Sequence, residues 1–207
     1  KVSMVFEQFL RLLIHCGLPS KDLNLIHCRG SEMGTLIDNV KESIRLIQFT
    51  GSNQVAENIS SVMNGLVRLE DAGFDWKIIG PDFNHQWLEY VAWQSDQDAY
   101  NASGQKCSAQ SILLCHKNWS PALLPKLKEL ASLRNMNDLS IGPILSWTNK
   151  AMLNHIQSIL ELSGTTLLFG GQILTNHNVP KCYGTLEPTA IKVPLDLLLG
   201  DEFHLIT

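Results

Sequence analysis

The stretch "RLIQFTGSNQVAENISSVMNGL", residues 45–66, joins a strand pattern to a helix pattern through a Gly-Ser turn. Residues 45–50 form the short apolar run of a buried strand. From residue 53 onward, apolar side chains recur at helical spacing, and Ser52 precedes them where an N-cap is expected. A strand, a tight turn and a helix in this order predict an α/β fold, in which helices flank a parallel sheet.

The residues before this stretch extend the alternation. Apolar residues at helical spacing predict a helix over residues 2–16, ended by a glycine and a proline. A short strand is expected at 22–28 and a short helix at 31–40. The order helix, strand, helix, strand, helix predicts a Rossmann-like part.

Glycine, proline and aspartate cluster in "LEDAGFDWKIIGPDFNH", residues 69–85, and we place a domain boundary there. The predicted domains are residues 1–72, a Rossmann-like cofactor-binding part, and 73–207, a second α/β part. In the second part we expect helices at 84–100, 120–133 and 149–162, and strands at 76–79, 111–116, 165–169 and 183–191.

Composition excludes several classes of protein. The net charge of −4 and the scattered lysines and arginines give no basic patch, so nucleic acid is not an expected partner. No apolar run is long enough to cross a bilayer, so no membrane partner is expected either. Five cysteines without a Cys-x-x-Cys pair argue against a disulfide framework or a structural zinc site, and indicate a reducing compartment.

Cys107, in "NASGQKCSAQ", is the candidate nucleophile. A cysteine reacts as its thiolate, which needs polar surroundings and an approach for substrate. Gly104 allows a sharp turn, and Ser108 and Ala109 are too small to block access. The alternative is that Cys107 is a small buried side chain, which is the commoner role of a free cysteine.

Two further sites are candidates for binding and acid-base chemistry. The turn at Gly51 and Ser52 directs backbone N–H groups and a helix dipole toward an anion such as a dinucleotide pyrophosphate. It lacks the Gly-x-Gly-x-x-Gly pattern, so an ordinary strand-to-helix turn is the alternative. Glu70 follows at a predicted strand end, where a carboxylate could act as a general base on water. A solvated carboxylate beside Asp71 is the alternative there.

The histidines indicate neither a metal nor a hydrolase. None has metal-ligand spacing, and none identifies itself as the partner of a catalytic cysteine; we expect them on the surface or in loops: His85, His116, His155 and His177. A thiol hydrolase that uses Cys107 with a histidine therefore stays a minor alternative.

Seven motifs in chain order resemble the aldehyde dehydrogenase family. They are "GLPSKDLNLI" (17–26), "FTGS" (49–52), "RLEDAG" (68–73), "SGQKCSAQS" (103–111), "IGPILS" (141–146), "LFGG" (168–171) and "LEPTAI" (186–191). The longer blocks "LEDAGFDWKIIGPD" and "YVAWQSDQDAYNASGQKCSAQS" resemble its plant-type pyrroline-5-carboxylate dehydrogenase branch. The resemblance implies NAD as cofactor, L-glutamate 5-semialdehyde as the small-molecule aldehyde substrate, no metal, a homo-oligomer and the mitochondrial matrix.

The resemblance also implies roles for individual residues. Cys107 would be the nucleophile, Glu70 the general base and Ser108 a substrate-binding residue. Residues that would bind the cofactor are Lys1, Gly51, Ser52 and Val55. Asp71 and Ala72 depart from the family, which has an apolar residue and two glycines after the base. The chain resembles the middle of such an enzyme, so we expect an internal fragment of an aldehyde dehydrogenase fold that is inactive alone; a truncated product that acts only by binding is the alternative.

Overall fold

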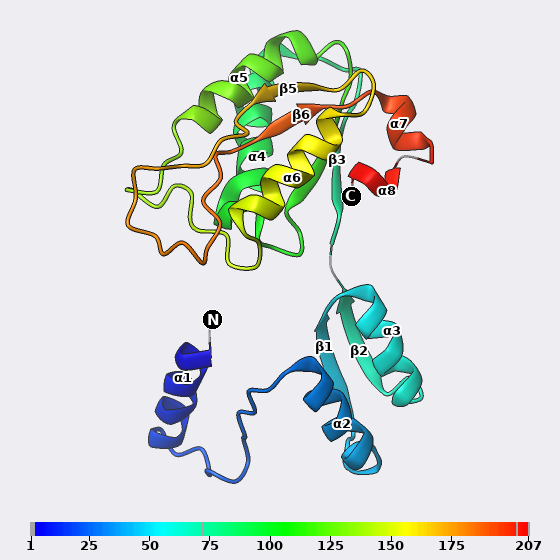
Figure 1. Cartoon of the computed structure of the whole chain (residues 1–207), viewed down its shortest axis with the longest axis vertical. Coiled ribbons are helices and arrows are strands. Elements are labelled where there is room, and N and C mark those ends of the chain that lie inside the picture. Colours follow the sequence, from blue (N-terminus) through cyan, green and yellow to red (C-terminus); the bar gives the residue numbers. More distant parts are fainter. Residues whose placement is uncertain (1–2, 72, 202, 207) are drawn as a thin grey trace. The chain divides into compact units, whose positions relative to one another are not determined.

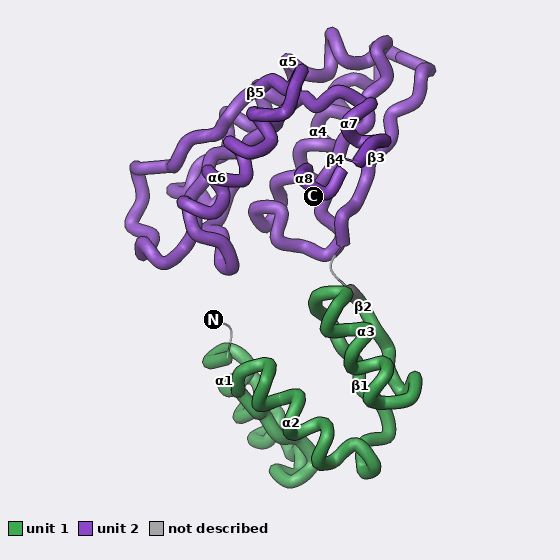
Figure 2. Tube along the Cα trace, turned by 45° about the vertical axis from the view of Figure 1, so that its right-hand side comes forward, with its two compact units in different colours: residues 1–72 green, residues 73–207 purple. Residues whose placement is uncertain are grey.

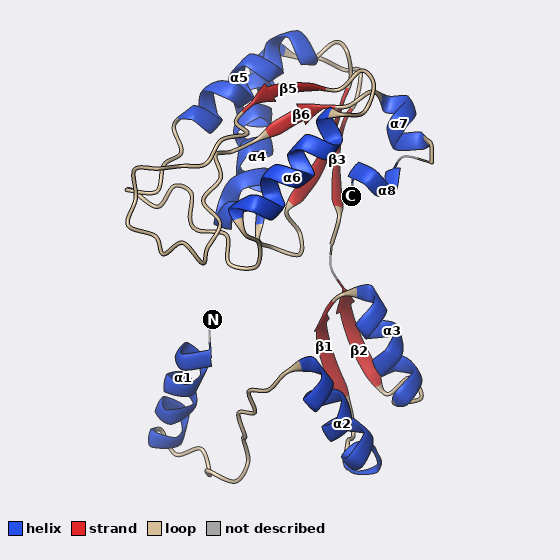
Figure 3. Ribbon diagram, viewed as in Figure 1, coloured by secondary structure: helices blue, strands red, loops and turns tan. Residues whose placement is uncertain are grey.

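A computed structural model describes residues 3–71, 73–201 and 203–206. The contacts divide the chain into two compact units, residues 1–72 and 73–207, at the position where the sequence analysis placed the boundary (Figure 2). Helices and strands alternate in both units (Figure 3). The predicted α/β class is therefore confirmed.

The first unit contains three helices and two strands among its described residues. Its helices are α1 (Ser3–His15), α2 (Gly30–Val40) and α3 (Asn53–Val62), with a 3-10 turn η1 (Lys41–Ser43) after α2. Strands β1 (Ile47–Gly51) and β2 (Val67–Asp71) pair in parallel, with α3 as the connection between them (Figure 1). Residues 45–66 thus supply the first strand and the helix of a βαβ unit, which β2 completes.

The buried side of α3 carries the small core of this unit. Ala56, Ile59 and Met63 are buried, and they follow the helical spacing that the sequence displays. Helix α1 forms at its predicted place, but none of its described residues is buried. The predicted strand at 22–28 is wrong: this segment has no regular structure, because no described strand pairs with its backbone groups.

Residues 73–201 and 203–206 of the second unit contain two small sheets. Strands β3 (Asp75–Ile79) and β4 (Gln110–Cys115) pair in parallel, and β5 (Thr166–Phe169) pairs antiparallel with β6 (Ala190–Lys192). The last predicted strand, 183–191, is shortened to β6, and the residues before it make only isolated bridges, Ile144 with Gly184 and Ile173 with Leu186.

The helices of the second unit lie between and after its strands along the chain. The 3-10 turn η2 (His85–Trp87) leads into α4 (Leu88–Tyr100), and η3 (Asn101–Gly104) follows. Helix α5 (Ser120–Ser132) begins with Pro121 in its first turn, as the sequence predicts. Helices α6 (Asn149–Leu160), α7 (Leu195–Leu199) and α8 (Phe203–Ile206) complete the unit. None of the helices in the described ranges is long and apolar enough to span a membrane.

The core of the second unit lies between α4 and α5. Its buried members come from these helices and the residue before α5: Leu88, Ala92, Trp119, Leu123 and Leu127. Side chains of β3 and β4 pack against this cluster. Both ends of the loop that carries Cys107, residues 101–109, are therefore attached to packed elements, α4 before it and β4 after it.

Candidate functional site

The end of β1 and the start of α3 form the predicted anion-binding turn. Gly51 ends β1 and Ser52 occupies the N-cap position of α3 with extended backbone angles. The Ser52 carbonyl accepts from Ala56 N at 3.0 Å, but the Ser52 side chain makes no capping hydrogen bond. Ser52 thus occupies the expected N-cap position, but the capping hydrogen bond of its side chain is absent. The first N–H groups of a ten-residue helix face outward here, at its positive end.

Glu70 lies at the same edge of the sheet as this turn. In the parallel pairing, Thr50 is opposite Glu70 and Gly51 is opposite Asp71, so the carboxyl ends of β1 and β2 lie side by side. The Glu70 side chain is exposed. A carboxylate and a helix N-terminus therefore share the edge at which open α/β sheets bind ligands.

Of the other two predicted cofactor residues, the structure describes Val55 but not Lys1. Val55 lies in the first turn of α3 and is 45% exposed, so it could contact a ligand held at this edge. Lys1 lies outside the described residues.

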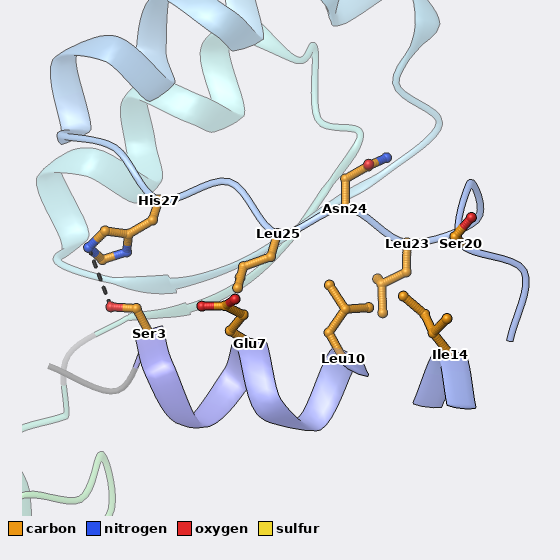
Figure 4. Close-up of a pocket in the computed structure, with 9 residues that line it drawn as sticks. All are labelled: Ser3, Glu7, Leu10, Ile14, Ser20, Leu23, Asn24, Leu25 and His27. Atoms are coloured by element: carbon orange, nitrogen blue, oxygen red, sulfur yellow. Dashed lines mark hydrogen bonds between the residues drawn. The ribbon is translucent and has the colours of Figure 1, made fainter. Parts of the chain in front are cut away.

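A hollow in the first unit lies apart from these residues. It is lined by α1 side chains and the segment that follows the helix, including Ser3, Glu7 and His27 (Figure 4). Ser3 Oγ and His27 Nε2 are 3.5 Å apart across it. Its lining includes no residue of the Gly51–Ser52 turn.

The loop between α4 and β4 presents Cys107 at the tip of a turn. Ala109 N donates to the Lys106 carbonyl at 3.1 Å, which places Cys107 and Ser108 at the two central positions of a β-turn. Cys107 and Ser108 are exposed, whereas Ala109, which ends the turn, is buried. The thiol and the neighbouring hydroxyl are therefore both accessible to a ligand, and the interpretation of Cys107 as a buried side chain is wrong.

The backbone before Cys107 adopts an unusual conformation. Ala102, Ser103 and Gly104 have successive φ angles of +54°, +57° and +70°. Left-handed conformations are costly for residues other than glycine, and they occur where surrounding contacts impose them. The expected sharp turn at Gly104 is present, and it includes two residues for which the sequence gives no such signal.

Gly73 packs directly against the Cys107 backbone. A Cβ atom added to Gly73 would overlap the Cys107 carbonyl oxygen, so only glycine fits at this contact. Gly73 ends the "RLEDAG" motif. The structure thus brings the end of one motif against the backbone of another.

The segment "IGPILS" also contacts this loop. Ser103 Oγ hydrogen bonds to both the N–H and the C=O of Gly142, at 2.8 Å each. Ser103 and Gly142 each belong to a motif quoted above, but the sequence does not indicate that the two motifs are in contact.

A buried ion pair joins α4 to the residues after α5, and it was not expected from the sequence. The side chains of Asp96 on α4 and Arg134 after α5 are 4% and 8% exposed, and they form an ion pair with two hydrogen bonds. Arg134 also donates to the Ser140 carbonyl at 2.7 Å and lies over the Tyr100 ring. Burial raises the pKa of Tyr100, and the nearby Asp96 carboxylate raises it further.

Two histidines use their rings for local hydrogen bonds. His116 Nδ1 accepts from Asn118 N at 3.2 Å, and His177 Nδ1 accepts from Val179 N at 3.1 Å. They stabilise their own loops. Among the described residues, no group of three His, Cys, Asp or Glu side chains could hold a metal ion.

The aldehyde dehydrogenase family model matches residues 1–196. The chain belongs to the aldehyde dehydrogenase family. Over its whole length it is 51% identical to the mitochondrial delta-1-pyrroline-5-carboxylate dehydrogenase of Arabidopsis thaliana, and it covers 37% of that protein. It is 28% identical to the 1-pyrroline-5-carboxylate dehydrogenase of Bacillus licheniformis, over 77% of this chain and 32% of the relative.

Solved structures of aldehyde dehydrogenases share the fold. The betaine aldehyde dehydrogenase of Staphylococcus aureus, solved in complex with NAD+, matches 89% of this chain and 37% of its own, with 25% identity and a TM-score of 0.73. The succinate-semialdehyde dehydrogenase of Burkholderia pseudomallei matches 88% of this chain and 38% of its own at 23% identity, with a TM-score of 0.71. The chain thus spans about a third of the length of these relatives, between 32% and 38%.

Proposed function

We propose that this chain contributes the nucleophile, the general base and part of the cofactor site to an NAD-dependent pyrroline-5-carboxylate dehydrogenase. The observation that carries the proposal is the 51% identity, over the whole chain, to the Arabidopsis enzyme of that name. The substrate is L-glutamate 5-semialdehyde, the open-chain form of pyrroline-5-carboxylate, and the product is glutamate. The Arabidopsis relative is mitochondrial, which supports the same compartment and a role in proline catabolism.

Cys107 forms the covalent bond to substrate in this proposal. Its thiolate attacks the aldehyde carbon, a C–S bond forms, and the carbonyl electron pair moves to oxygen to give a thiohemiacetal. The exposed position of Cys107 at the tip of a turn supports this role. Ser108, next to it in the turn, hydrogen bonds the distant carboxylate of the substrate.

A bound NAD+ would supply the hydride acceptor: as the hydride leaves the substrate carbon, the thiohemiacetal oxygen re-forms its C=O bond and a thioester remains on Cys107. The residues at the end of β1 fit NAD+, because the Gly51–Ser52 turn is followed by a helix N-terminus that favours phosphate. Val55, in the first turn of α3, would pack against the adenine, and Lys1, outside the described residues, would bind the adenosine ribose.

Glu70 completes the reaction by releasing the product. It removes a proton from water, the water oxygen attacks the thioester carbon, and the Cys107 thiolate leaves, which restores the nucleophile. The carboxylate shares a sheet edge with the cofactor turn and is exposed, which suits a group that must contact water. The two electrons that the aldehyde loses leave with the hydride, so the product is the carboxylate.

Substitution of the nucleophile tests the proposal in the complete enzyme that carries this chain. Cys107→Ala should abolish the reduction of NAD+ by pyrroline-5-carboxylate and leave the Kd for NAD+ unchanged. Cys182→Ala is the matched control, because Cys182 is also exposed but lies outside the proposed site. Turnover that survives Cys107→Ala would refute the proposal. A native protein that ends at Thr207 and shows no turnover would favour the truncated, inactive alternative.

A further inference from the structure

Two side chains beside Cys107 bind one short segment of the second unit. We call residues 142–145 the brace segment. Ser103 lies four residues before the thiol and Gln105 two residues before it. Both side chains hydrogen bond to the backbone of the brace segment and to no other segment distant in sequence among the described contacts.

Each side chain uses both its donor and its acceptor. Ser103 Oγ donates to the Gly142 carbonyl and accepts from Gly142 N, both at 2.8 Å. Gln105 Nε2 donates to the Pro143 carbonyl at 3.0 Å, and its Oε1 accepts from Leu145 N at 2.7 Å. A side-chain amide offers the same donor and acceptor as a peptide group, so Gln105 pairs with the brace segment as a neighbouring strand would.

The brace segment is itself fixed on its opposite side. Ile144 N and O pair with Gly184 O and N, at 2.8 Å each. Just before the segment, Arg134 binds the Ser140 carbonyl and is held by the buried Asp96. The partner that Ser103 and Gln105 bind is therefore anchored from two directions.

The left-handed backbone of the loop depends on these contacts. The φ angles of Ala102 and Ser103, +54° and +57°, are energetically unfavourable for residues with a side chain. Such angles persist where contacts with the surrounding structure impose them. Gln105 Nε2 also reaches the Ala102 carbonyl at 3.2 Å, which closes the loop on itself. The hydrogen bonds of Ser103 and Gln105 to the brace segment are contacts of this kind.

We infer that Ser103 and Gln105 are positioning residues that hold the Cys107 turn in one conformation by binding the brace segment. The inference rests on the proposed function, in which Cys107 must meet the aldehyde carbon in an attacking geometry. A displacement of about 1 Å at a reacting group can cost about a hundredfold in rate. Neither residue touches the substrate in this account.

The test measures the single-turnover rate of NADH formation in the complete enzyme. Gln105→Met keeps the size of the side chain and removes its hydrogen bonds, and Ser103→Ala removes the hydroxyl. Each should lower the rate about tenfold or more, with the Kd for NAD+ changed less than twofold. Gln172→Met and Asn101→Ala are the matched controls, since both residues are exposed and lie outside these contacts, and both variants should retain the rate.

A second variant separates positioning from stability. In Gln105→Glu, an ionised carboxylate would face the Ala102 and Pro143 carbonyls, whereas the protonated acid would again donate to one of them. The rate of Gln105→Glu relative to the unmodified enzyme should therefore rise as the pH falls, a recovery that loss of stability alone would not produce. Gln105→Met and Ser103→Ala at the unmodified rate, or a pH-independent ratio for Gln105→Glu, would overturn the inference. Absence of NADH in the unmodified enzyme would instead refute the proposed function.

Discussion

Loss of the Asp96 carboxylate should strongly destabilise the second unit. Asp96→Ala leaves the Arg134 guanidinium buried, with its side chain 8% exposed, and removes the acceptor of two of its hydrogen bonds. Breaking one partner of a buried ion pair costs about 3 to 5 kcal/mol. Arg134→Met in the same chain removes the stranded charge, so the double variant should lose less than the sum of the two single losses.

Urea denaturation followed by tryptophan fluorescence measures this loss. The measurement uses the 207-residue chain, whose five tryptophans lie between residues 76 and 147, inside the second unit, so its signal reports on the unit that contains the pair. Glu89→Ala is the control on the same helix: Glu89 is 74% exposed in its pair with Lys126, and its loss should cost about 0.5 kcal/mol or less. An Asp96→Ala loss no larger than that of Glu89→Ala, or strictly additive losses in the double variant, would refute the reasoning.

Three smaller perturbations test other contacts of the second unit. Burial pushes the pKa of Asp98 upward, but the hydrogen bonds from Lys77 and Gln94 and the charges of Lys77 and Lys106 together outweigh it, so the pKa lies below its usual value. Asp98→Asn should therefore be less stable at pH 7, by up to about 1 kcal/mol, and the difference should vanish as the pH falls through the folded-state pKa; a deficit that persists in acid would contradict this. Burial raises the pKa of the Cys115 thiol, so iodoacetamide should alkylate the exposed Cys107 before Cys115. Peptide mass spectrometry would follow the two thiols, and equal rates of alkylation would contradict the assignment of Cys107 as the accessible thiol. Gly73→Ala should lower the urea midpoint by the equivalent of about 1 to 3 kcal/mol, because the new methyl overlaps a backbone oxygen that cannot rotate away; an unchanged midpoint would show that the contact is loose.

The strand-turn-helix unit was predictable because its determinants are local. Apolar spacing located α3 near its observed place, and the Gly-Ser turn located the end of β1. The segment 22–28 has an equally apolar pattern but forms no strand, since a strand also requires a partner and pairing is not encoded locally. The strand expected at 183–191 meets the same difficulty, because residues 183–189 make only isolated bridges and the strand contracts to β6.

The sequence names the residues of the candidate site but not the contacts around them. Cys107, Ser108 and Glu70 were named from motifs, and the structure places all three at exposed positions. The hydrogen bonds of Ser103 and Gln105 to the brace segment join residues about forty positions apart, a pairing that no periodic pattern reports. The buried Asp96–Arg134 pair was missed for the same reason, because a charged residue in a helix indicates a solvated face unless its partner is known.

The central claim is that Cys107 carries the acyl group and Glu70 releases it, and one measurement tests both roles. The complete enzyme with Glu70→Gln is mixed with NAD+ and pyrroline-5-carboxylate, quenched in acid, and analysed by peptide mass spectrometry while NADH is followed by absorbance. The account predicts a single burst of NADH, close to one per active site, and a glutamyl thioester on the Cys107 peptide. Unimpaired steady turnover, or an acyl adduct on a peptide without Cys107, would contradict it.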